Sequence, residues 1–246
     1  MSKQIAIVTG GGAGLGLAIT KKLVSEGIHV IMIGRTEDKL QAAAAELGDL
    51  CSYRVLDLQD LKAIPALIDE IYLAHGQIDI LVNNAGINMK KVFTEVTDAD
   101  FATIIQTNLS SVFSMSREVV KKMIEQQRGS IVNISSMAAQ YGIPKVIAYS
   151  AAKTGIEGMT RAMSTELSPL GIRTNCVAPG FIETAMSAKA LDADPERKNK
   201  VFSRTPMGKM GLPEDVAEAV YFLCSAGAKY VTGVVMPVDG GNSVGF

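Results

Sequence analysis

Short runs of apolar, often β-branched residues alternate along the chain with longer segments whose apolar residues recur at helical spacing. Nearly continuous apolar runs are typical of strands buried on both faces of a sheet, and regular alternation of strand and helix predicts a parallel sheet. The expected helices cover residues 14–26, 37–47, 60–75, 98–127, 148–168 and 213–225. The expected strands are Ile5–Val8, Ile28–Ile33, Ser52–Val55, Ile78–Val82, Ser130–Ile134, Arg173–Val177 and Val234–Val238.

This order of elements predicts an α/β fold with a doubly wound, seven-stranded parallel sheet and helices on both of its faces. No linker rich in Pro, Gly or Ser divides the chain, so we expect a single domain over residues 1–246. Residues 183–212 depart from the pattern with several prolines, glycines and mixed charges. We expect this stretch to be a partly helical excursion above the sheet that serves as a substrate lid.

Composition and charge exclude several classes of function. The formal net charge is −1 and no basic run or patch is present, which argues against a nucleic-acid partner. The longest apolar runs fall well short of the roughly 20 residues that a membrane span needs. The N-terminal residues lead directly into the first strand without a charged leader or a cleavage site. We therefore expect a protein of the cytoplasm without a membrane partner.

The few cysteines and histidines also limit the possible chemistry. Cys51, Cys176 and Cys224 are an odd number at wide spacing, which indicates reduced thiols and not a disulfide framework. His29 and His75 have no third ligand nearby in the sequence, so we expect no metal site.

A glycine-rich loop joins the first predicted strand to the first predicted helix. Its sequence, from Thr9 to Gly16, reads TGGGAGLG. Glycines allow a tight turn and a close approach of the backbone to a pyrophosphate, and the helix N-terminus offers free N–H groups and the positive end of its dipole. The loop therefore predicts a dinucleotide cofactor, and the fold class becomes a Rossmann domain.

The end of the second predicted strand bears on the choice between NAD and NADP. Proteins that bind NAD usually carry an acidic residue here to accept hydrogen bonds from the ribose hydroxyls, but this chain has Gly34 followed by Arg35. Without an acid to repel it, a 2′-phosphate could pair with the planar guanidinium of Arg35. We predict NADP(H) over NAD(H), although Glu37 and Asp38 lie close by.

Tyr149 and Lys153 are the sharpest chemical signal in the chain. Residues four apart share one face of a helix, and a nearby ammonium group stabilises a phenolate. An ordinary exposed Tyr/Lys pair has the same spacing. Ser136 lies 13 residues before Tyr149 and just after a predicted strand, and Asn108 lies in the long helix before that strand.

Together, the TGxxxGxG loop, the NNAG sequence at Asn83–Gly86 and the YxxxK pair resemble the short-chain dehydrogenase/reductase family. The resemblance runs from Thr9 to Gly241. It implies a catalytic set of Asn108, Ser136, Tyr149 and Lys153. It also implies cofactor contacts at Gly10, Gly12, Gly14, Leu15, Gly16, Arg35, Asp57, Leu58, Asn84, Ala85, Gly86, Tyr149, Lys153, Pro179, Gly180, Ile182 and Thr184.

The implied roles are chemically reasonable. Tyr149 exchanges a proton with the substrate oxygen, and Ser136 hydrogen-bonds that oxygen. Lys153 lowers the pKa of the tyrosine and holds the nicotinamide ribose, and Asn108 holds a water that links Lys153 to solvent. Ser135 is the alternative to Ser136, one residue short of the family spacing.

The substrate is less well defined by the sequence. The regions Asn108–Phe113 and Pro179–Thr184 resemble those of bacterial 3-oxoacyl-thioester reductases, but Gln127 and Leu170 occupy positions where members acting on acyl-carrier protein often carry arginine, although Arg128 is adjacent. A sugar-acid or polyol dehydrogenase of the gluconate 5-dehydrogenase type is the alternative, with Lys90 and Lys91 as groups that could attract a carboxylate. A non-catalytic NADP-binding sensor is a remote third.

The resemblance also bears on assembly. The segments 98–127 and 148–168 are similar to the helices that pack between subunits in this family. We therefore expect a homotetramer, with a dimer as the alternative.

Overall fold

A parallel sheet of seven strands organises the part of the chain that the structure describes. The computed structural model describes residues 3–184, 199 and 201–245. The strand order is β3-β2-β1-β4-β5-β6-β7, and every pairing is parallel. The seven predicted strands and the predicted sheet are confirmed. Their bounds are Ile5–Thr9 (β1), His29–Gly34 (β2), Cys51–Val55 (β3), Ile80–Asn83 (β4), Gly129–Ile134 (β5), Ile172–Pro179 (β6) and Val235–Val238 (β7).

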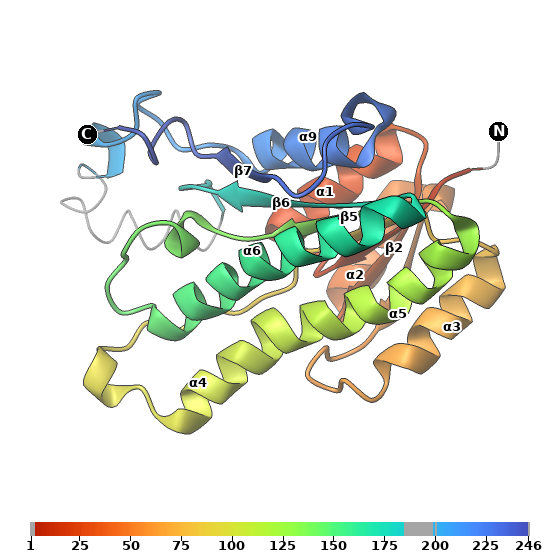
Figure 1. The fold of residues 1–246 in the computed structure, drawn as a ribbon, viewed down its shortest axis with the longest axis horizontal. Helices are drawn as coiled ribbons and strands as arrows, with labels where there is room; N and C mark the ends of the chain where they lie inside the picture. Colours follow the sequence, from red (N-terminus) through yellow and green to blue (C-terminus); the bar gives the residue numbers. More distant parts are fainter. Residues whose placement is uncertain (1–2, 185–198, 200, 246) are drawn as a thin grey trace.

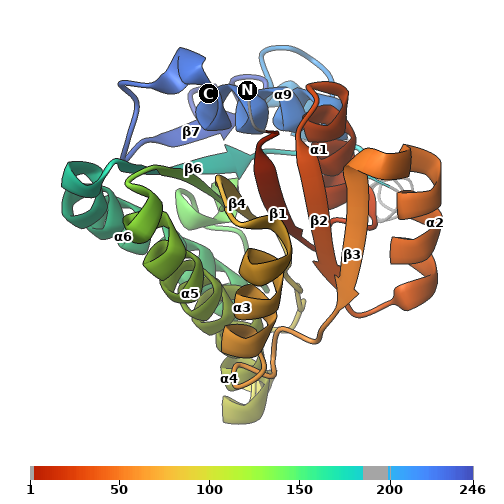
Figure 2. The same ribbon diagram turned by 90° about the vertical axis from the view of Figure 1, so that its right-hand side faces the viewer.

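Helices cover both faces of this sheet (Figures 1 and 2). One face carries α1 (Gly14–Ser25), α2 (Glu37–Leu47) and α9 (Pro213–Cys224). The other carries α3 (Ile64–His75), α5 (Ser111–Gln126) and α6 (Ile147–Leu167), and α4 (Asp98–Ile105) precedes α5. Short 3₁₀ turns span Gly48–Leu50, Phe93–Glu95, Met137–Ala139, Ser168–Leu170 and Ala226–Ala228.

Alternation of side chains along the strands builds two hydrophobic cores. In β1, Ile5 and Ile7 pack into the cluster beneath α3 and α5, whereas Ala6 and Val8 pack into the cluster beneath α1 and α9. Because successive side chains of a strand point to opposite faces, a strand covered on both sides is apolar at every position. This is why the predicted strands are nearly continuous apolar runs.

The long helix predicted for residues 98–127 is interrupted in the structure. α4 ends at Ile105, a π-helical turn (η3) covers Gln106–Ser110, and α5 begins at Ser111. A π-turn inserts one extra residue into the helical repeat and often marks a functional site. The apolar spacing continues through the insertion, so the sequence pattern did not reveal it. The prediction of one continuous helix was wrong, and the break falls at Asn108.

The helix predicted for residues 60–75 begins only at Ile64. Pro65 lies in its first turn, where a missing N–H group costs nothing because first-turn N–H groups have no intrahelical acceptor. The preceding residues form turns instead, with Ala63 N donating to the carbonyl of Asp60.

The crevice for a ligand follows from the strand order. β1 pairs with β2 on one side and with β4 on the other, so the connections after β1 and β4 leave the sheet toward opposite faces. In open α/β sheets ligands bind at such a switch point, outside the carboxyl ends of the strands. The loops after β1 and β4 are therefore where a site is expected.

The predicted lid falls only partly within the described residues. Residues 185–198 and 200 lie outside them, so the lid interpretation stays a prediction. The two ends of the stretch come together, because Ile182 forms a parallel bridge with Gly211. Among the helices that the structure describes, none is long and apolar enough to cross a membrane.

Candidate active site

The glycine loop after β1 adopts a backbone that requires glycine. Gly10 and Gly14 have φ values of +68° and +51°, a region that other residues rarely adopt. A Cβ on Gly16 would overlap the carbonyl oxygen of Gly10, whereas one on Gly14 would meet no atom within 4 Å. The first turn of α1 thus faces open space with unpaired N–H groups. These features fit a pyrophosphate at this helix N-terminus.

Thr9, the last residue of β1, joins this loop to the loop after β4. Its Oγ1 accepts hydrogen bonds from the backbone N–H groups of Asn84 and Ala85, each at 3.0 Å. The Asn84 side chain donates back to the Thr9 carbonyl at 3.0 Å. Thr9 was not among the predicted cofactor contacts, although its place at the end of the first strand was a usable signal. These hydrogen bonds fix the loop after β1 relative to the loop after β4, on the two sides of the crevice.

A pocket at the ends of β2 and β3 suits the adenosine half of a dinucleotide. Arg35 Nη1 lies 3.7 Å from Asp57 Oδ2, and both side chains are about half exposed. An exposed ion pair of this kind contributes little to stability, so Arg35 can exchange it for another anion. The lining of the pocket includes six of the predicted contacts, namely Gly10, Arg35, Asp57, Leu58, Ala85 and Gly86, together with Gly34 and Ile87.

The π-turn brings Asn108 into contact with the loop after β4. Asn108 is fully buried. Its Oδ1 accepts from Ile87 N at 2.8 Å, and its Nδ2 donates to the Ile87 carbonyl at 2.7 Å. Both ends of the amide are therefore used to hold residues just after Gly86, where a Cβ would lie 3.7 Å from Lys153 Nζ. The family resemblance implies a bound water at Asn108, and the structure shows that its side chain also fixes the backbone beside Lys153.

Two consecutive serines follow β5, and the structure separates their environments. Ser135 is buried and its Oγ donates to Glu157 Oε1 at 2.8 Å. The Ser136 hydroxyl instead hydrogen-bonds the phenol of Tyr149. Its Oγ also accepts from Ala138 N at 3.2 Å. Of the two candidates, Ser136 is the one that meets the tyrosine.

Tyr149 and Lys153 lie one turn apart near the N-terminus of α6. Lys153 Nζ is 5.6 Å from the centroid of the Tyr149 ring and donates to the carbonyl of Ile134 at 2.7 Å. Burial raises the pKa of Tyr149, and the bond from Ser136 opposes that rise. Burial lowers the pKa of Lys153 to about 8. The phenol therefore carries its proton at neutral pH, beside a cation that has little hydration.

The segment after β6 closes the far side of the crevice. Gly180 N donates to the Val238 carbonyl at 3.0 Å, and a Cβ on Gly180 would come within 2.6 Å of Asp239 Cβ. Ile182 is buried and bridges to Gly211. Pro179 ends β6, and Thr184 is the last residue of the described range 3–184. These predicted cofactor residues thus lie at the same edge of the sheet as the glycine loop.

The described part of the chain contains no group of three His, Cys, Asp or Glu side chains that could hold a metal ion. Cys51, Cys176 and Cys224 are all unpaired and buried. Burial raises the pKa of each of these thiols, which makes them poor nucleophiles because the thiolate is the reactive form. The chemistry of the site therefore rests on hydroxyls and one ammonium group.

The fold, the glycine loop and the Ser/Tyr/Lys cluster are those of a short-chain dehydrogenase/reductase, and the chain belongs to this family. The sequence model of a family described as enoyl-(acyl carrier protein) reductase matches residues 10–243. The protein is accordingly an oxidoreductase that uses a nicotinamide cofactor and acts on a CH–OH or carbonyl group.

The chain is also similar to individual proteins of known name or structure. The 3-oxoacyl-(acyl-carrier-protein) reductase FabG of Haemophilus influenzae is 39% identical over 241 residues, which cover 98% of both chains. A variant of actinorhodin polyketide ketoreductase, solved with NADPH, is 33% identical with a TM-score of 0.91 and covers 98% of both chains. A candidate gluconate dehydrogenase from Agrobacterium tumefaciens is also 33% identical, with a TM-score of 0.95, covering 99% of this chain and 97% of that one.

Proposed function

We propose that this protein is an NADP(H)-dependent 3-oxoacyl-thioester reductase in which Asn108, Ser136, Tyr149 and Lys153 form the catalytic set. The observation that carries the proposal is the hydrogen-bonded pair of Ser136 and Tyr149 beside the buried Lys153, at the end of a crevice shaped for a dinucleotide. When bound, the nicotinamide supplies or accepts the hydride. Every other step falls to side chains of this chain.

The proton for reduction comes from Tyr149. Because burial keeps its pKa above the ordinary value, the phenol is protonated at neutral pH and can donate to an oxygen that gains negative charge. Ser136, already bonded to this phenol, donates to the same oxygen and steadies its charge. The ammonium of Lys153 stabilises the phenolate that remains. Asn108 holds the backbone after Gly86 in place beside this lysine.

We also assign the remaining predicted cofactor residues to dinucleotide binding. The glycine loop residues Gly10, Gly12, Gly14, Leu15 and Gly16 would hold the pyrophosphate, with the ribose and nicotinamide toward Lys153 and Pro179–Thr184. The preference for NADP(H) is supported by Gly34, which puts no carboxylate near a 2′-phosphate, and by the weakly held guanidinium of Arg35. The single domain over residues 1–246 and a lid in residues 183–212 complete the proposal.

The sugar-acid alternative loses part of its support. Lys91, one of the two cations proposed to attract a carboxylate, binds Asp100 Oδ2 at 2.6 Å. The hydrogen bond from Lys91 is the main reason that the pKa of Asp100 is lowered to about 2. Since this ammonium is already paired, the carbohydrate hypothesis rests on the likeness to the candidate gluconate dehydrogenase. A non-catalytic sensor would not need Ser136 bonded to Tyr149.

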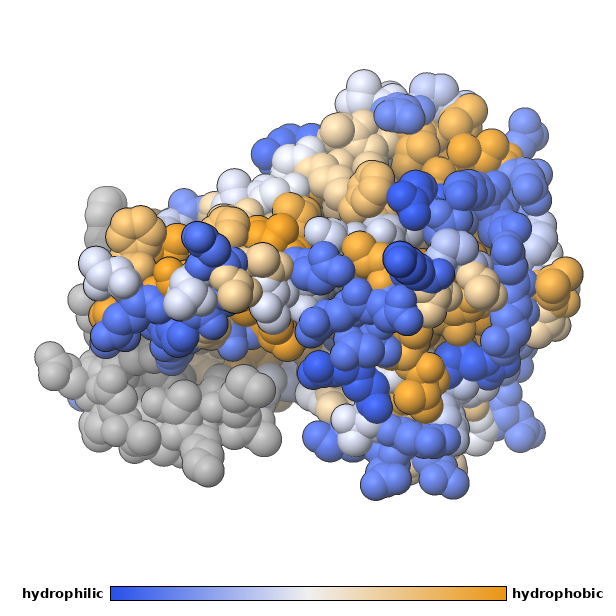
Figure 3. Space-filling view, turned by 90° about the horizontal axis from the view of Figure 1, so that it is seen from below, coloured by the Kyte–Doolittle hydropathy of each residue, from blue (hydrophilic) through white to orange (hydrophobic). Residues whose placement is uncertain are grey.

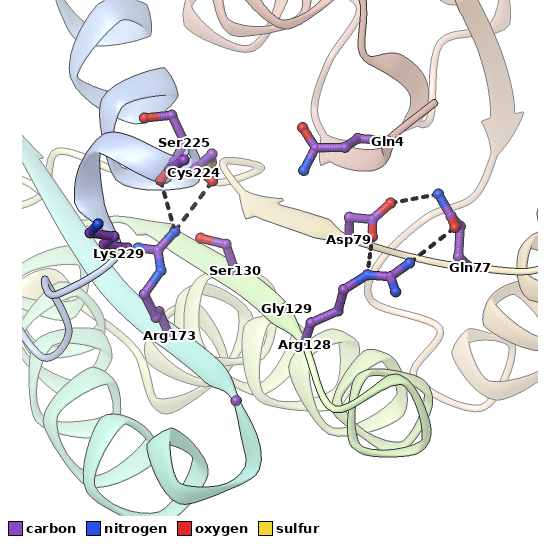
Figure 4. Close-up of a pocket in the computed structure, with 12 residues that line it drawn as sticks. Gln4, Gln77, Asp79, Arg128, Gly129, Ser130, Arg173, Cys224, Ser225 and Lys229 are labelled. Atoms are coloured by element: carbon purple, nitrogen blue, oxygen red, sulfur yellow. Dashed lines mark hydrogen bonds and ion pairs between the residues drawn. The ribbon is translucent and has the colours of Figure 1, made fainter. Parts of the chain in front are cut away.

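The nature of the acyl carrier depends on a different part of the surface. Gln127 and Leu170, where carrier-protein reductases often have arginine, lie on two turns that touch, because a Cβ on Gly171 would overlap the Gln127 carbonyl. The neighbouring Arg128 donates to Asp79 Oδ1 at 3.0 Å and to Gln77 Oε1 at 3.1 Å (Figure 4). This guanidinium is mostly committed within the protein, so we propose that a small thioester suffices as substrate.

A substrate panel tests this function. Initial rates would be measured with NADPH and NADH on acetoacetyl thioesters of coenzyme A and of acyl-carrier protein, on keto forms of gluconate, and on simple ketones. We expect fast NADPH-dependent reduction of the thioesters, with the carrier protein conferring no large advantage. If sugar acids were turned over and the thioesters were not, the result would contradict the proposal and support the sugar-acid dehydrogenase alternative. Tight cofactor binding with no turnover across the panel would instead indicate a sensor.

We further propose a homotetramer that assembles through α5 and α6. Several large apolar side chains on and beside these helices are exposed, namely Phe101, Phe113, Ile124 and Ile147. Figure 3, seen from below relative to Figure 1, shows hydrophobic residues scattered among hydrophilic ones on this side. Light scattering is expected to give the mass of four chains, and the mass of one chain would contradict the assembly. Three buried, unpaired cysteines support a reducing, cytoplasmic location.

A further inference from the structure

Three segments that are far apart in the sequence meet through side-chain hydrogen bonds. Tyr141 Oη donates to Asn242 Oδ1 at 2.8 Å, and Asn242 Nδ2 donates to Thr205 Oγ1 at 2.9 Å. The Thr205 hydroxyl in turn donates to the carbonyl of Val201 at 2.8 Å. The Tyr141–Asn242–Thr205 network thus joins the loop after Ser136, the segment 201–207 and the C-terminal tail at 239–245.

Burial restrains the hydrogen bonds of this network. Asn242 and Thr205 are 3% and 6% exposed, and Tyr141 is half-buried. A buried amide or hydroxyl that loses its partner cannot turn to water instead, so each bond restrains the next. The backbone of the tail is held as well, because Met207 N donates to the Gly240 carbonyl at 3.1 Å. The tail is therefore an anchored part of the fold.

The network lies on the side of the crevice that carries Ser136. Tyr141 belongs to the connection that begins with Ser136 and ends at α6, just before Tyr149, and its N–H donates to the Met137 carbonyl at 3.2 Å. Figure 1 shows this loop and the C-terminal tail at the same end of the sheet, where β6 and β7 finish. The glycine loop and Arg35 belong to the other half of the sheet, on β1 and β2.

We propose that Tyr141 is a positioning residue for the reaction, which uses its bond to Asn242 to brace the Ser136 loop against the C-terminal tail. The Tyr141 ring extends to the tail, and the hydrogen bond from its hydroxyl to Asn242 fixes the position of the loop. Because the loop carries Ser136, its position determines how well the substrate oxygen is held. The tail therefore contributes to substrate binding without touching the dinucleotide. This inference rests on the proposed roles of Ser136 and Tyr149.

The test compares Tyr141→Phe and Asn242→Ala with the wild-type enzyme, using the panel carbonyl compound that the wild type reduces fastest. We expect the KM for that compound to rise about tenfold in each variant, as for the loss of one buried hydrogen bond. The Kd for NADPH should stay within about twofold. The double variant should be no worse than Asn242→Ala alone, since that substitution already removes the link to Tyr141.

Tyr230→Phe is the matched control, because the Tyr230 side chain is 99% exposed and is not one of the three side chains of the network; its KM should equal that of the wild type. A wild-type KM in Tyr141→Phe would overturn the proposal, as would an equal loss of NADPH affinity, which would indicate general damage. If Asn242→Ala does not fold, Tyr141→Phe alone decides. Turnover retained by Tyr149→Phe would instead refute the catalytic roles on which the inference rests.

Discussion

Replacing Tyr149 by phenylalanine is expected to lower kcat by about 10³-fold, within the range typical of a lost general acid. The ring stays in place, so its packing against the buried cluster of Ile104, Ala148 and Ala152 is kept, and only the proton donor disappears. Because burial raises the pKa of Tyr149, the phenol is protonated at neutral pH, and the substitution removes the proton donor of the proposed mechanism. The measurement is the steady-state rate of NADPH oxidation with the preferred carbonyl substrate.

Cofactor binding separates this effect from misfolding. The glycine loop and Arg35 do not involve Tyr149, so the Kd for NADPH, measured by fluorescence titration, should change little. Tyr230→Phe, on an exposed phenol, should keep wild-type turnover. If Tyr149→Phe retained more than about a tenth of the wild-type kcat, the acid/base role would have to pass to another group.

Replacing Gly34 by aspartate is expected to reverse the cofactor preference. A Cβ at this position would make only ordinary contact with Leu40 Cδ2, at 3.4 Å, so the side chain can be accommodated. The new carboxylate would repel a 2′-phosphate and would compete for the guanidinium of Arg35. We expect kcat/KM with NADPH to fall about 100-fold, as for the loss of about 3 kcal/mol of charge-assisted hydrogen bonding. The value for NADH should rise.

Gly34→Ala is the matched control, since it adds the Cβ without the charge. Its NADPH kinetics should remain close to those of the wild type, and a fall as large as that of Gly34→Asp would trace the effect to steric crowding. Equal kcat/KM values for NADPH and NADH in the wild-type protein would contradict the preference itself. Either result would be read from initial rates with both cofactors at a fixed substrate concentration.

Features that depend on local chain geometry were predictable from the sequence. Buried parallel strands need apolar residues at every position, so all seven strands could be found. A tight turn before a helix needs glycine, so the loop at Gly10–Gly16 was evident. Four-residue spacing places Tyr149 and Lys153 on one helix face. The family resemblance added Asn108 and Ser136, and the structure brings all four near one another.

Only the tertiary structure decided which polar groups pair with one another. It directs Ser135 to Glu157 and Ser136 to Tyr149, and it ties Lys91 to Asp100. The π-turn at Asn108 also escaped the sequence pattern, because the apolar spacing continues through the inserted residue.

The same division applies to Tyr141 and Asn242, which are 101 positions apart. Nothing in their local sequence indicates that they meet. Patterns of turns, strands and helices are set by short-range backbone preferences, whereas the partner of a buried polar side chain is set by how distant segments pack. The sequence by itself therefore determined the fold and the type of chemistry in this protein. The packing of distant segments decided which polar side chains pair and how the reactive groups are positioned.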